Sequence, residues 1–501
     1  MLHDAPLAIP MVQLTIFALG ILVIDLMTPE RWKWVNAASA LAGILFAAYS
    51  VFQVQGLLAR SPRGAVVAFA GSLLVDRYAI YFWYLFLVGA AIAILMSIHY
   101  MEVEREHHGE FYALILLSVV GMMCMAAGLD IILIFIGLEL MAISTYVLVG
   151  FLRRDKRSNE ASLKYLLLGA FSSGIFAYGL SLLYGLTGST KLGEIAYGLR
   201  SHATDPVAIL ALLTTATGLL FKIAAIPFHQ WAPDAYEGAP TSITAFMSVA
   251  VKSAAWAMLI HVLVLGLGPL HSVWVPLLVV VSVATMTGAN LAALTQNNLK
   301  RLLAYSSIAH VGYMLLGLVA FGSSVPGSVD GTNGIKGILV YLLVYTFMNL
   351  GAFAVITSLR RRDVIGDEID DIAGLVHRAP TEAVLMLFFL LSLAGIPPLA
   401  GFWGKYFIFL SLIETGHYVL ASLAVLYAVF GLYYYMRIAN AMLIRQPLER
   451  DRITTGPAMK VALGVTALAT LYIGIFPNWF INAVNWSLYL VQSHPIANLI
   501  R

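Results

Sequence analysis

Two apolar stretches, each interrupted by a lysine and by proline, decide how this chain folds. The first reads LLFKIAAIPFHQWAPDAYEGAP over residues 219–240, and the second reads LSLAGIPPLAGFWGK over residues 391–405. Proline removes a backbone donor and breaks a helix at a cost of about 3 kcal/mol. Inside a bilayer, broken backbone is tolerated only where protein buries it or where it lines a water-filled cavity. The two stretches therefore predict a pair of interrupted membrane helices.

The composition places the whole chain in a membrane. Of its 501 residues, 60% are hydrophobic and 11% are charged, whereas an average soluble domain is about 25% charged. The net charge of +3 comes from no basic domain that would suggest nucleic acid. The single cysteine, Cys124, excludes an internal disulfide, and without a cysteine cluster we expect no iron–sulfur or zinc site. No cleavable leader is recognised, so the first apolar run is expected to be a retained span.

We expect an all-α polytopic membrane protein with about fourteen transmembrane helices and no soluble domain. A span needs roughly 20 apolar residues, and the sequence offers enough of them. The seventh and twelfth helices are the irregular ones, because they contain the proline motifs. The expected spans are 7–27, 35–54, 79–99, 111–128, 130–150, 164–187, 206–228, 242–265, 273–294, 302–321, 337–358, 382–414, 418–443 and 458–483.

The two proline motifs lie five helices apart, which predicts an internal repeat. An odd number of spans per unit gives the two units opposite orientations, and transporters commonly pair inverted repeats with broken helices. We expect helices 4–8 at residues 111–265 and helices 9–13 at residues 266–443 to form this inverted pair. Helices 1–3 at residues 1–110 and helix 14 at residues 444–501 would flank it.

Basic residues gather in the loops that follow odd-numbered helices. By the positive-inside rule these loops face the cytoplasm, so both termini lie on the opposite face of the membrane. The loop after the third helix is acidic and forms an exception, although acidic residues contribute little to the rule. The basic residues counted are Arg153, Arg154, Lys156, Arg157, Lys300, Arg301, Arg360, Arg361, Arg362, Arg445, Arg450 and Arg452.

Four ionisable residues lie inside otherwise apolar spans: Glu139, Lys222, Lys252 and Lys405. Each costs about 2.5–3.5 kcal/mol on insertion scales unless it is paired or hydrated. For any one of them, snorkelling to the surface or a purely structural ion pair is the alternative explanation. Glu139 and Lys222 are too central to snorkel easily, and four such groups in one chain favour a functional role.

The chemistry of these groups suits proton transfer. Burial disfavours the charged form of a lysine, and a nearby carboxylate favours it. A buried lysine can therefore release its proton when its carboxylate partner moves away. This reasoning makes Glu139 and Lys222 a candidate switch, with Lys252 and Lys405 as later positions of the relay.

Both predicted helix breaks lie beside a lysine. Pro227 lies five residues beyond Lys222, and Pro397 and Pro398 shortly precede Lys405. Broken backbone that faces water would let water reach each lysine. An ordinary packing kink is the alternative, but its coincidence with a charge at both sites favours function.

Other polar residues are weaker candidates for the relay. His310 could pass protons between the lysines of the two halves, or it could be a core histidine with satisfied hydrogen bonds. His229 and Asp234 lie in an expected loop or half-helix near the cytoplasmic side, where His229 and Glu237 are more readily explained by a structural role. The aromatic run at residues 433–435 is expected to pack or to line a water channel.

Several motifs resemble one known family. The stretch FKIAAIPFHQWAPDAYEGAPT at residues 221–241 resembles the signature of the proton-translocating, antiporter-like subunits of respiratory complex I (NDH-1). Its YEGAPT part, followed by Lys252, is similar to subunit N (subunit 2) in particular. The resemblance covers roughly residues 110–410. Further matching motifs are ASLKYLLLGA (161–170), LYGLTGS (183–189), NLKRLLAYSSIAH (298–310) and GIPPLAGF (395–402).

The resemblance implies a function and a setting. It implies that Glu139 and Lys222 form the modulating pair, that Lys252 is a central relay and that Lys405 is the outer-half lysine. It also implies a multi-subunit NADH:quinone oxidoreductase of a bacterial inner membrane, in which partner subunits hold FMN, iron–sulfur clusters and quinone. This chain has no dinucleotide fingerprint, so we expect it to bind no cofactor or metal and to do no redox chemistry itself.

Three alternatives remain open from the sequence. One is a subunit of a multisubunit cation/proton antiporter, which the YEG motif with Lys252 disfavours. Another is the related subunit of a ferredoxin- or hydrogenase-linked proton-pumping complex. The third, a membrane scaffold with no proton path, is disfavoured by the four charges inside spans.

Overall fold

A computed structural model gives the fold. It describes residues 4–61, 64–104, 106, 108–324, 329–360, 366–447 and 455–488. Four of the arginines that were counted for the predicted orientation lie outside these residues, namely Arg361, Arg362, Arg450 and Arg452.

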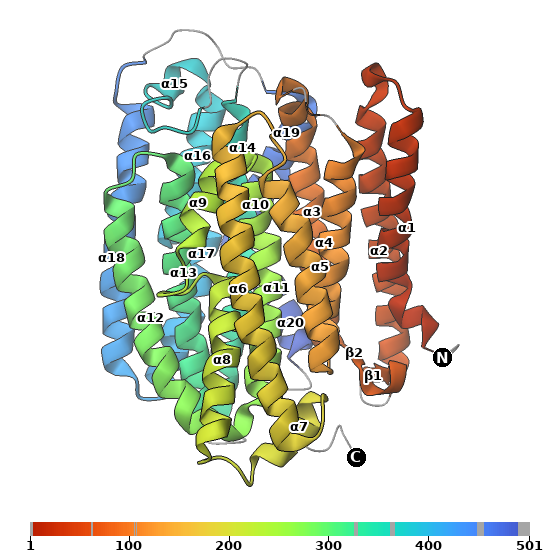
Figure 1. Cartoon of the computed structure of the whole chain (residues 1–501). Helices are drawn as coiled ribbons and strands as arrows, with labels where there is room; N and C mark the ends of the chain where they lie inside the picture. Colours follow the sequence, from red (N-terminus) through yellow and green to blue (C-terminus); the bar gives the residue numbers. More distant parts are fainter. Residues whose placement is uncertain are drawn as a thin grey trace.

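The chain is a bundle of long helices (Figure 1). In the described residues, thirteen helical segments are long and apolar enough to cross a membrane. Two further helices of 15 residues each, α16 and α17, together make one interrupted span. The prediction of an all-α membrane protein with about fourteen spans is confirmed.

The helices up to the middle of the chain are α1 (Ala5–Met27), α2 (Trp34–Arg60), α3 (Arg77–Glu104), α4 (Gly109–Ala127), α5 (Ile131–Val149), α6 (Lys156–Thr187), α7 (Leu192–Leu199), α8 (Pro206–Ile223), α9 (Trp231–Gly238), α10 (Thr241–Phe246) and α11 (Lys252–Ile260). The later helices are α12 (His271–Leu294), α13 (Leu299–Ser323), α14 (Val329–Ser358), α15 (Leu375–Arg378), α16 (Pro380–Ala394), α17 (Ala400–Glu414), α18 (Tyr418–Leu443), α19 (Pro457–Ile475) and α20 (Asn478–Ser487). Short 3₁₀ turns lie at Glu30–Trp32, Phe69–Gly71 and Gly268–Leu270.

Short elements mark the two ends of the bundle. Strands β1 (Ala65–Ala68) and β2 (Leu73–Asp76) form an antiparallel hairpin with Ala65 opposite Asp76. This hairpin, which was not predicted from the sequence, lies toward the same end as α7, whereas α15 lies at the other end (Figure 1). The hairpin follows the second span and α7 follows the sixth. Successive spans cross the membrane in alternate directions, so segments that follow even-numbered spans are expected at the same end of the bundle.

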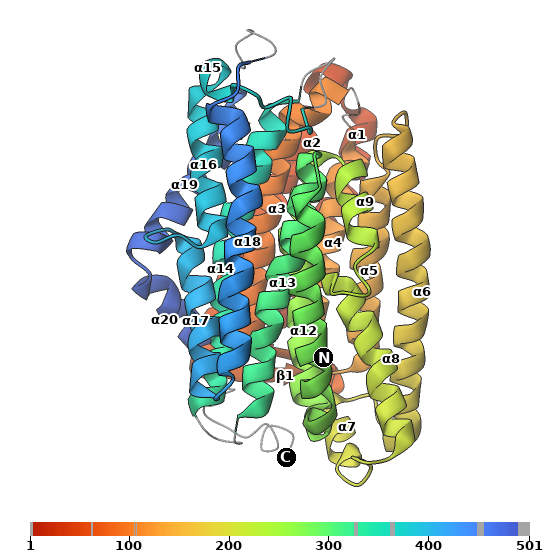
Figure 2. The same ribbon diagram turned by 90° about the vertical axis from the view of Figure 1, so that its left-hand side faces the viewer.

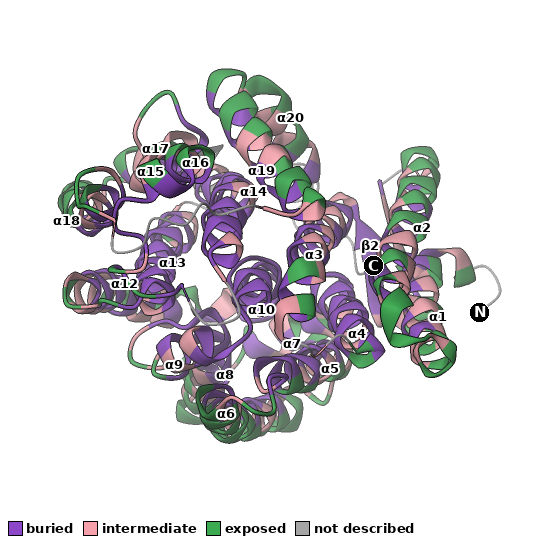
Figure 3. Ribbon diagram, turned by 90° about the horizontal axis from the view of Figure 1, so that it is seen from above, coloured by how far each residue is buried: buried purple, intermediate pink, exposed green. Residues whose placement is uncertain are grey.

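Figure 2 shows the bundle from a second side, and the colouring by burial in Figure 3 separates an inner set of helices from an outer set. In the most apolar stretch of each span, 94% of the residues are buried in α13 and 89% in α14, whereas 28% are buried in α18 and 33% in α1. The outer helices expose large apolar side chains, as helices in contact with lipid do. The inner set is therefore the place where a buried charge can meet a protein partner.

Two spans are broken where the proline motifs predicted. Helix α8 ends at Ile223, because Ala224 adopts a left-handed conformation with φ 61°, and α9 resumes at Trp231. Helix α16 ends at Ala394, where Gly395 has φ 88°, and α17 begins at Ala400. The Ile226–Pro227 and Pro397–Pro398 peptide bonds in the two breaks are both cis.

The second helices of the two predicted repeats, α5 and α13, begin in the same way. The backbone before α5 forms an antiparallel bridge between Asp130 and Lys191, and the backbone before α13 forms one between Asn298 and Glu368. In both places the side chain of the residue before the helix also accepts from its first turn. The inverted pair, with boundaries at residues 111–265 and 266–443, stays a prediction.

Several helix boundaries differ from the expectation. Helix α6 begins at Lys156 and not at residue 164, because the Asp155 side chain caps its first turn. Asn298 does the same for α13, which starts three residues before the expected position. The expected last span divides into α19 and α20 at Pro477, where the chain turns.

Candidate functional site

The predicted relay residues lie on inner helices, apart from Glu139. Lys222, Lys252 and Lys405 have 4%, 2% and 7% of their surface exposed, and His310 has 2%. They lie on α8, α11, α17 and α13, while Glu139 is half-buried on α5. Four such groups so far from water each need protein partners, because an unpaired buried charge is expensive.

Lys222 contacts a tyrosine. Its Nζ donates a hydrogen bond to Tyr146 Oη at 3.2 Å and lies 5.5 Å from the centre of the same ring. Both Lys222 and Glu139 are described, and no ion pair within 4 Å joins them, although Glu139 is near enough to act on Lys222 electrostatically. One Glu139 oxygen is buried without a hydrogen-bond partner among the described residues.

Lys252 lies between two distorted turns of its helix. The π-helical turn Met247–Val251 precedes it, and a second π-helical turn, His261–Gly266, follows α11. Turns of this kind occur frequently at functional sites. The Lys252 ammonium donates to the carbonyl oxygen of Ser307 at 3.3 Å and also contacts its hydroxyl group, so it is anchored on α13.

His310 connects three helices through its two ring nitrogens. Nδ1 lies 2.5 Å from Tyr341 Oη on α14, and Nε2 lies 3.1 Å from Tyr435 Oη on α18. Tyr435 Oη is also 2.5 Å from Ser306 Oγ, which neighbours the anchor of Lys252. His310 is near enough to both Lys252 and Lys405 to be affected by their charges. Its role as a relay between the two lysines stays a prediction.

Lys405 caps the carboxyl end of α16 at the second helix break. Its Nζ donates to the carbonyl oxygens of Leu393 at 3.2 Å and Ala394 at 2.6 Å, at the end of α16. It also lies 5.4 Å from the ring centre of Tyr313. The carboxyl end of a helix carries a partial negative charge that favours a cation there, so the broken helix itself provides a partner for this ammonium.

At the first break, a different side chain caps the end of the helix. At the end of α8, Trp231 Nε1 donates to the Phe221 carbonyl oxygen at 2.9 Å. His229 lies in the turn between α8 and α9, and its Nδ1 is buried with no hydrogen-bond partner in the described part of the chain. An indole thus takes at the first break the capping role that an ammonium takes at the second.

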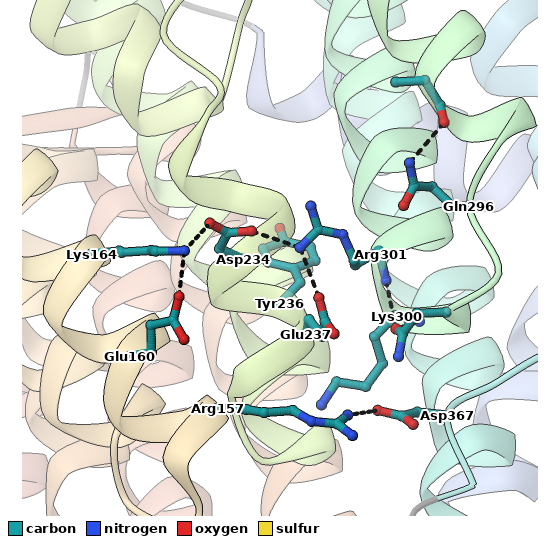
Figure 4. A network of polar contacts seen from close by, with 12 residues as sticks. Arg157, Glu160, Lys164, Asp234, Tyr236, Glu237, Gln296, Lys300, Arg301 and Asp367 are labelled. Carbon is teal, nitrogen blue, oxygen red and sulfur yellow. Dashed lines mark hydrogen bonds and ion pairs between the residues drawn. The ribbon is translucent and has the colours of Figure 1, made fainter.

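A cluster of charges joins α6, α9 and α13 at a cavity of about 200 Å³ (Figure 4). Asp234 accepts from Lys164 at 3.0 Å and from Arg301 at 2.6 Å, and Arg301 also binds Glu237 at 2.7 Å. Lys164 is in turn 2.7 Å from Glu160. Asp234 is thus held by two cations, which gives it a structural role beside its candidate role in the relay.

Sequence reasoning missed three members of the buried polar set. It placed Lys300 in a basic loop, but the residue is 4% exposed and its Nζ donates to the Ala239 carbonyl oxygen at 2.7 Å. Asn298, a typical helix N-cap, is the signal that could have moved Lys300 into the helix. Tyr146 and Tyr435 gave no such signal, because a tyrosine in an apolar helix is compatible with simple packing.

No metal site emerges in the part of the chain that the structure describes: there, no three His, Cys, Asp or Glu side chains form a group that could hold an ion.

Two broken spans beside buried lysines, within a bundle of about fourteen spans, define an antiporter-like membrane protein. Residues 128–431 match the family described as NADH:quinone oxidoreductase/Mrp antiporter, TM. The NADH-quinone oxidoreductase subunit N 1 of Koribacter versatilis is 63% identical over 505 aligned positions, which cover 99% of this chain and 98% of that protein.

Two solved structures are also similar. A chain of respiratory complex I from Thermus thermophilus aligns with a TM-score of 0.79 and 31% identity, covering 95% of this chain and 99% of that chain. A chain of an archaeal membrane-bound sulfane sulfur reductase aligns with a TM-score of 0.85 and 25% identity, covering 98% of both. The chain belongs to the NADH:quinone oxidoreductase/Mrp antiporter family, on the branch of the NADH-quinone oxidoreductase N subunits.

Proposed function

We propose that this chain is the proton-translocating membrane subunit N of an NADH:quinone oxidoreductase, respiratory complex I. The observation that carries the proposal is the buried set of Lys252, His310 and Lys405 inside a bundle of this family, with hydroxyl groups in contact with Lys252 and with His310. The 63% identity with a subunit N and the likeness to a complex I chain support it.

The hydrogen bonds suggest a route for the proton. Lys252 contacts Ser307, and the neighbouring Ser306 contacts Tyr435, which contacts His310. A hydroxyl group both donates and accepts, so each can receive one proton while it releases another. In this proposal the proton passes from Lys252 through these groups to His310, and from there toward Lys405.

Glu139 and Lys222 act before that route, as the modulating pair. In the described arrangement Lys222 binds Tyr146, and one Glu139 oxygen is buried without a partner. A carboxylate oxygen in that position is ready to accept the ammonium if the lysine side chain turns toward it. The pair would then form and separate during turnover, alternately holding and releasing the proton of Lys222.

The energy for this transfer comes from partner subunits. They hold FMN, iron–sulfur clusters and quinone, and they pass electrons from NADH to quinone. This chain contributes proton transfer in the bacterial inner membrane, with its N- and C-termini on the non-cytoplasmic side. His229 and Asp234 border the break and the charged cluster, and they serve the relay from its cytoplasmic side.

Two related assemblies are the alternatives. A cation/proton antiporter subunit and a subunit of a ferredoxin- or hydrogenase-linked complex would share the fold. The likeness to a chain of the sulfane sulfur reductase shows that other respiratory membrane complexes use this fold. The higher identity with an NADH-quinone oxidoreductase subunit, 63% against 25%, favours the function proposed first.

The test is Lys222→Ala in the intact complex, in inverted membrane vesicles. We expect NADH-driven quinone reduction and proton uptake to fall, while NADH:ferricyanide activity reports that the assembled redox arm is unchanged. Lys460→Ala is the matched control, because Lys460 is exposed. If Lys222→Ala leaves both quinone reduction and pumping intact, the relay assignment is wrong. An NADH-independent cation/proton exchange would instead favour the antiporter.

A further inference from the structure

Tyr146 is the described side chain that binds the Lys222 ammonium directly. Its hydroxyl accepts from Nζ at 3.2 Å, and the same nitrogen lies 5.5 Å from the centre of its ring, beyond the hydroxyl edge. A hydroxyl oxygen that accepts from an ammonium stabilises its charge. The orientation of Lys222 in this structure is therefore set by a neutral partner, not by Glu139.

The fold fixes Tyr146 tightly. A Cβ atom on Gly169 would lie only 2.1 Å from Tyr146 Oη, so the glycine makes the room that the hydroxyl occupies. The ring packs edge-on against Tyr165, with centroids 4.6 Å apart. Two residues of α6 thus confine one side chain of α5, and the hydroxyl has little freedom to leave Lys222.

Tyr146 and Glu139 present the lysine with two alternative acceptors. They are seven residues apart on α5, which is about two helical turns and places them on the same face. The charge of Glu139 acts on both Tyr146 and Lys222. We propose that Tyr146 is a positioning residue, which holds Lys222 away from Glu139 until the ammonium transfers to the carboxylate.

An aromatic stack extends this arrangement to the broken helix. Tyr165 lies parallel to Trp231, with centroids 4.5 Å apart and planes 12° apart. Trp231 is the first residue of α9, and its indole caps the carbonyl of Phe221, the residue before Lys222. A displacement of α9 would therefore act on Lys222 in two ways: through the bond from Trp231 to the backbone of Phe221, and through the packing of Trp231 on Tyr165 and of Tyr165 on Tyr146.

The test is Tyr146→Phe in the assembled complex in inverted vesicles. This change removes one oxygen atom and keeps the ring against Tyr165. Hydrogen bonds between membrane helices contribute about 0.6 kcal/mol on average and at most about 1.7 kcal/mol, so quinone-linked turnover should fall about threefold and at most about eighteenfold. The solvent deuterium isotope effect on that turnover should rise, since proton transfer at Lys222 becomes more limiting. A purely structural role would lower the amount of complex and leave the isotope effect unchanged.

Gly169→Ala tests the same contact from the other side, because its methyl group must displace the hydroxyl without removing it. Matched controls are Tyr178→Phe, at an exposed tyrosine of α6, and Gly174→Ala, where nothing lies within 4 Å of the new atom. We expect both test variants to behave alike and both controls to behave as wild type. Wild-type turnover in Tyr146→Phe overturns the inference.

The inference rests on the proposed function, and Lys222→Ala separates the two. If Lys222→Ala abolishes pumping while Tyr146→Phe is neutral, only the positioning role fails. If Lys222→Ala itself leaves pumping unchanged, both the relay assignment and the positioning role of Tyr146 are wrong.

Discussion

Gly401→Ala is the most severe small change that the structure offers, because α17 passes the end of α16 at this glycine. A Cβ atom on Gly401 would lie 1.8 Å from the Ser392 carbonyl oxygen, which is backbone and cannot rotate away. A carbon–oxygen contact normally needs about 3.3 Å. The two half-helices must therefore separate by about 1.5 Å, which also disturbs the bond from the Gly401 backbone N–H to Ser392 Oγ at 3.1 Å.

The displacement reaches Lys405, one turn further along α17. Its bond to the Ala394 carbonyl oxygen is 2.6 Å long, so the same movement would stretch it to about 4 Å and break it. Overpacking a core typically costs about 1–3 kcal/mol, which a large complex can tolerate. Misplacing a reacting group by about 1 Å can cost up to about a hundredfold in rate. We expect an assembled complex whose pumping is at least about tenfold lower.

The assay is NADH-driven proton uptake by inverted vesicles, with NADH:ferricyanide activity as the measure of assembled enzyme. Gly464→Ala on α19 is the matched control, because nothing lies within 4 Å of its new atom. Wild-type pumping by Gly401→Ala would refute the reasoning that the approach of α16 and α17 positions Lys405.

Three further predictions concern the other contacts of the site. Lys405→Met removes two charge-assisted bonds, each worth about 1.5–3 kcal/mol, so NADH-driven pumping in vesicles should drop at least about tenfold; unchanged pumping would exclude Lys405 from the relay. Arg301→Gln removes the arginine partner of Asp234 and Glu237, whose side chains are only about a quarter exposed, so it should destabilise the fold by about 1–2 kcal/mol in thermal unfolding of the complex. Arg445→Gln, at an exposed ion pair, is the control and should cost below about 0.5 kcal/mol, so equal shifts would contradict the prediction. Tyr435→Phe should slow quinone-linked turnover about threefold, with Tyr433→Phe as the exposed control that should not; equal rates would remove Tyr435 from the route.

The sequence predicted the site where a residue was out of place in its surroundings. A lysine in an apolar span is costly, so Lys222, Lys252 and Lys405 are conspicuous in the sequence alone. The helix breaks were predictable for a similar reason, because proline cannot continue a helix. The number of spans followed from apolar length, which is a local property of the chain.

The rest of the site depends on which faces of distant helices meet. Tyr146 suits packing and hydrogen bonding equally, and only the approach of α8 to α5 and α6 shows which of these it does. Tyr435 was expected merely to pack or to line a channel, yet it contacts His310 from a helix 125 positions further along the chain. Such contacts are set by tertiary packing and leave no mark in the local pattern of the sequence.

The halves of the second broken span also bear on how the protein is made. At a rise of about 1.5 Å per residue, each 15-residue half is about 22 Å long, which is shorter than the roughly 30 Å hydrocarbon core. Neither half can cross the bilayer alone, so the insertion machinery must release them as one unit. The backbone of the turn between them, at Gly395–Leu399, packs against Gly474 of α19, since a Cβ atom on that glycine would lie 2.3 Å from the Pro398 carbonyl oxygen. Biogenesis of this subunit should therefore settle the second broken span only once α19 has been made, which truncations ending after α17 and after α19 would reveal.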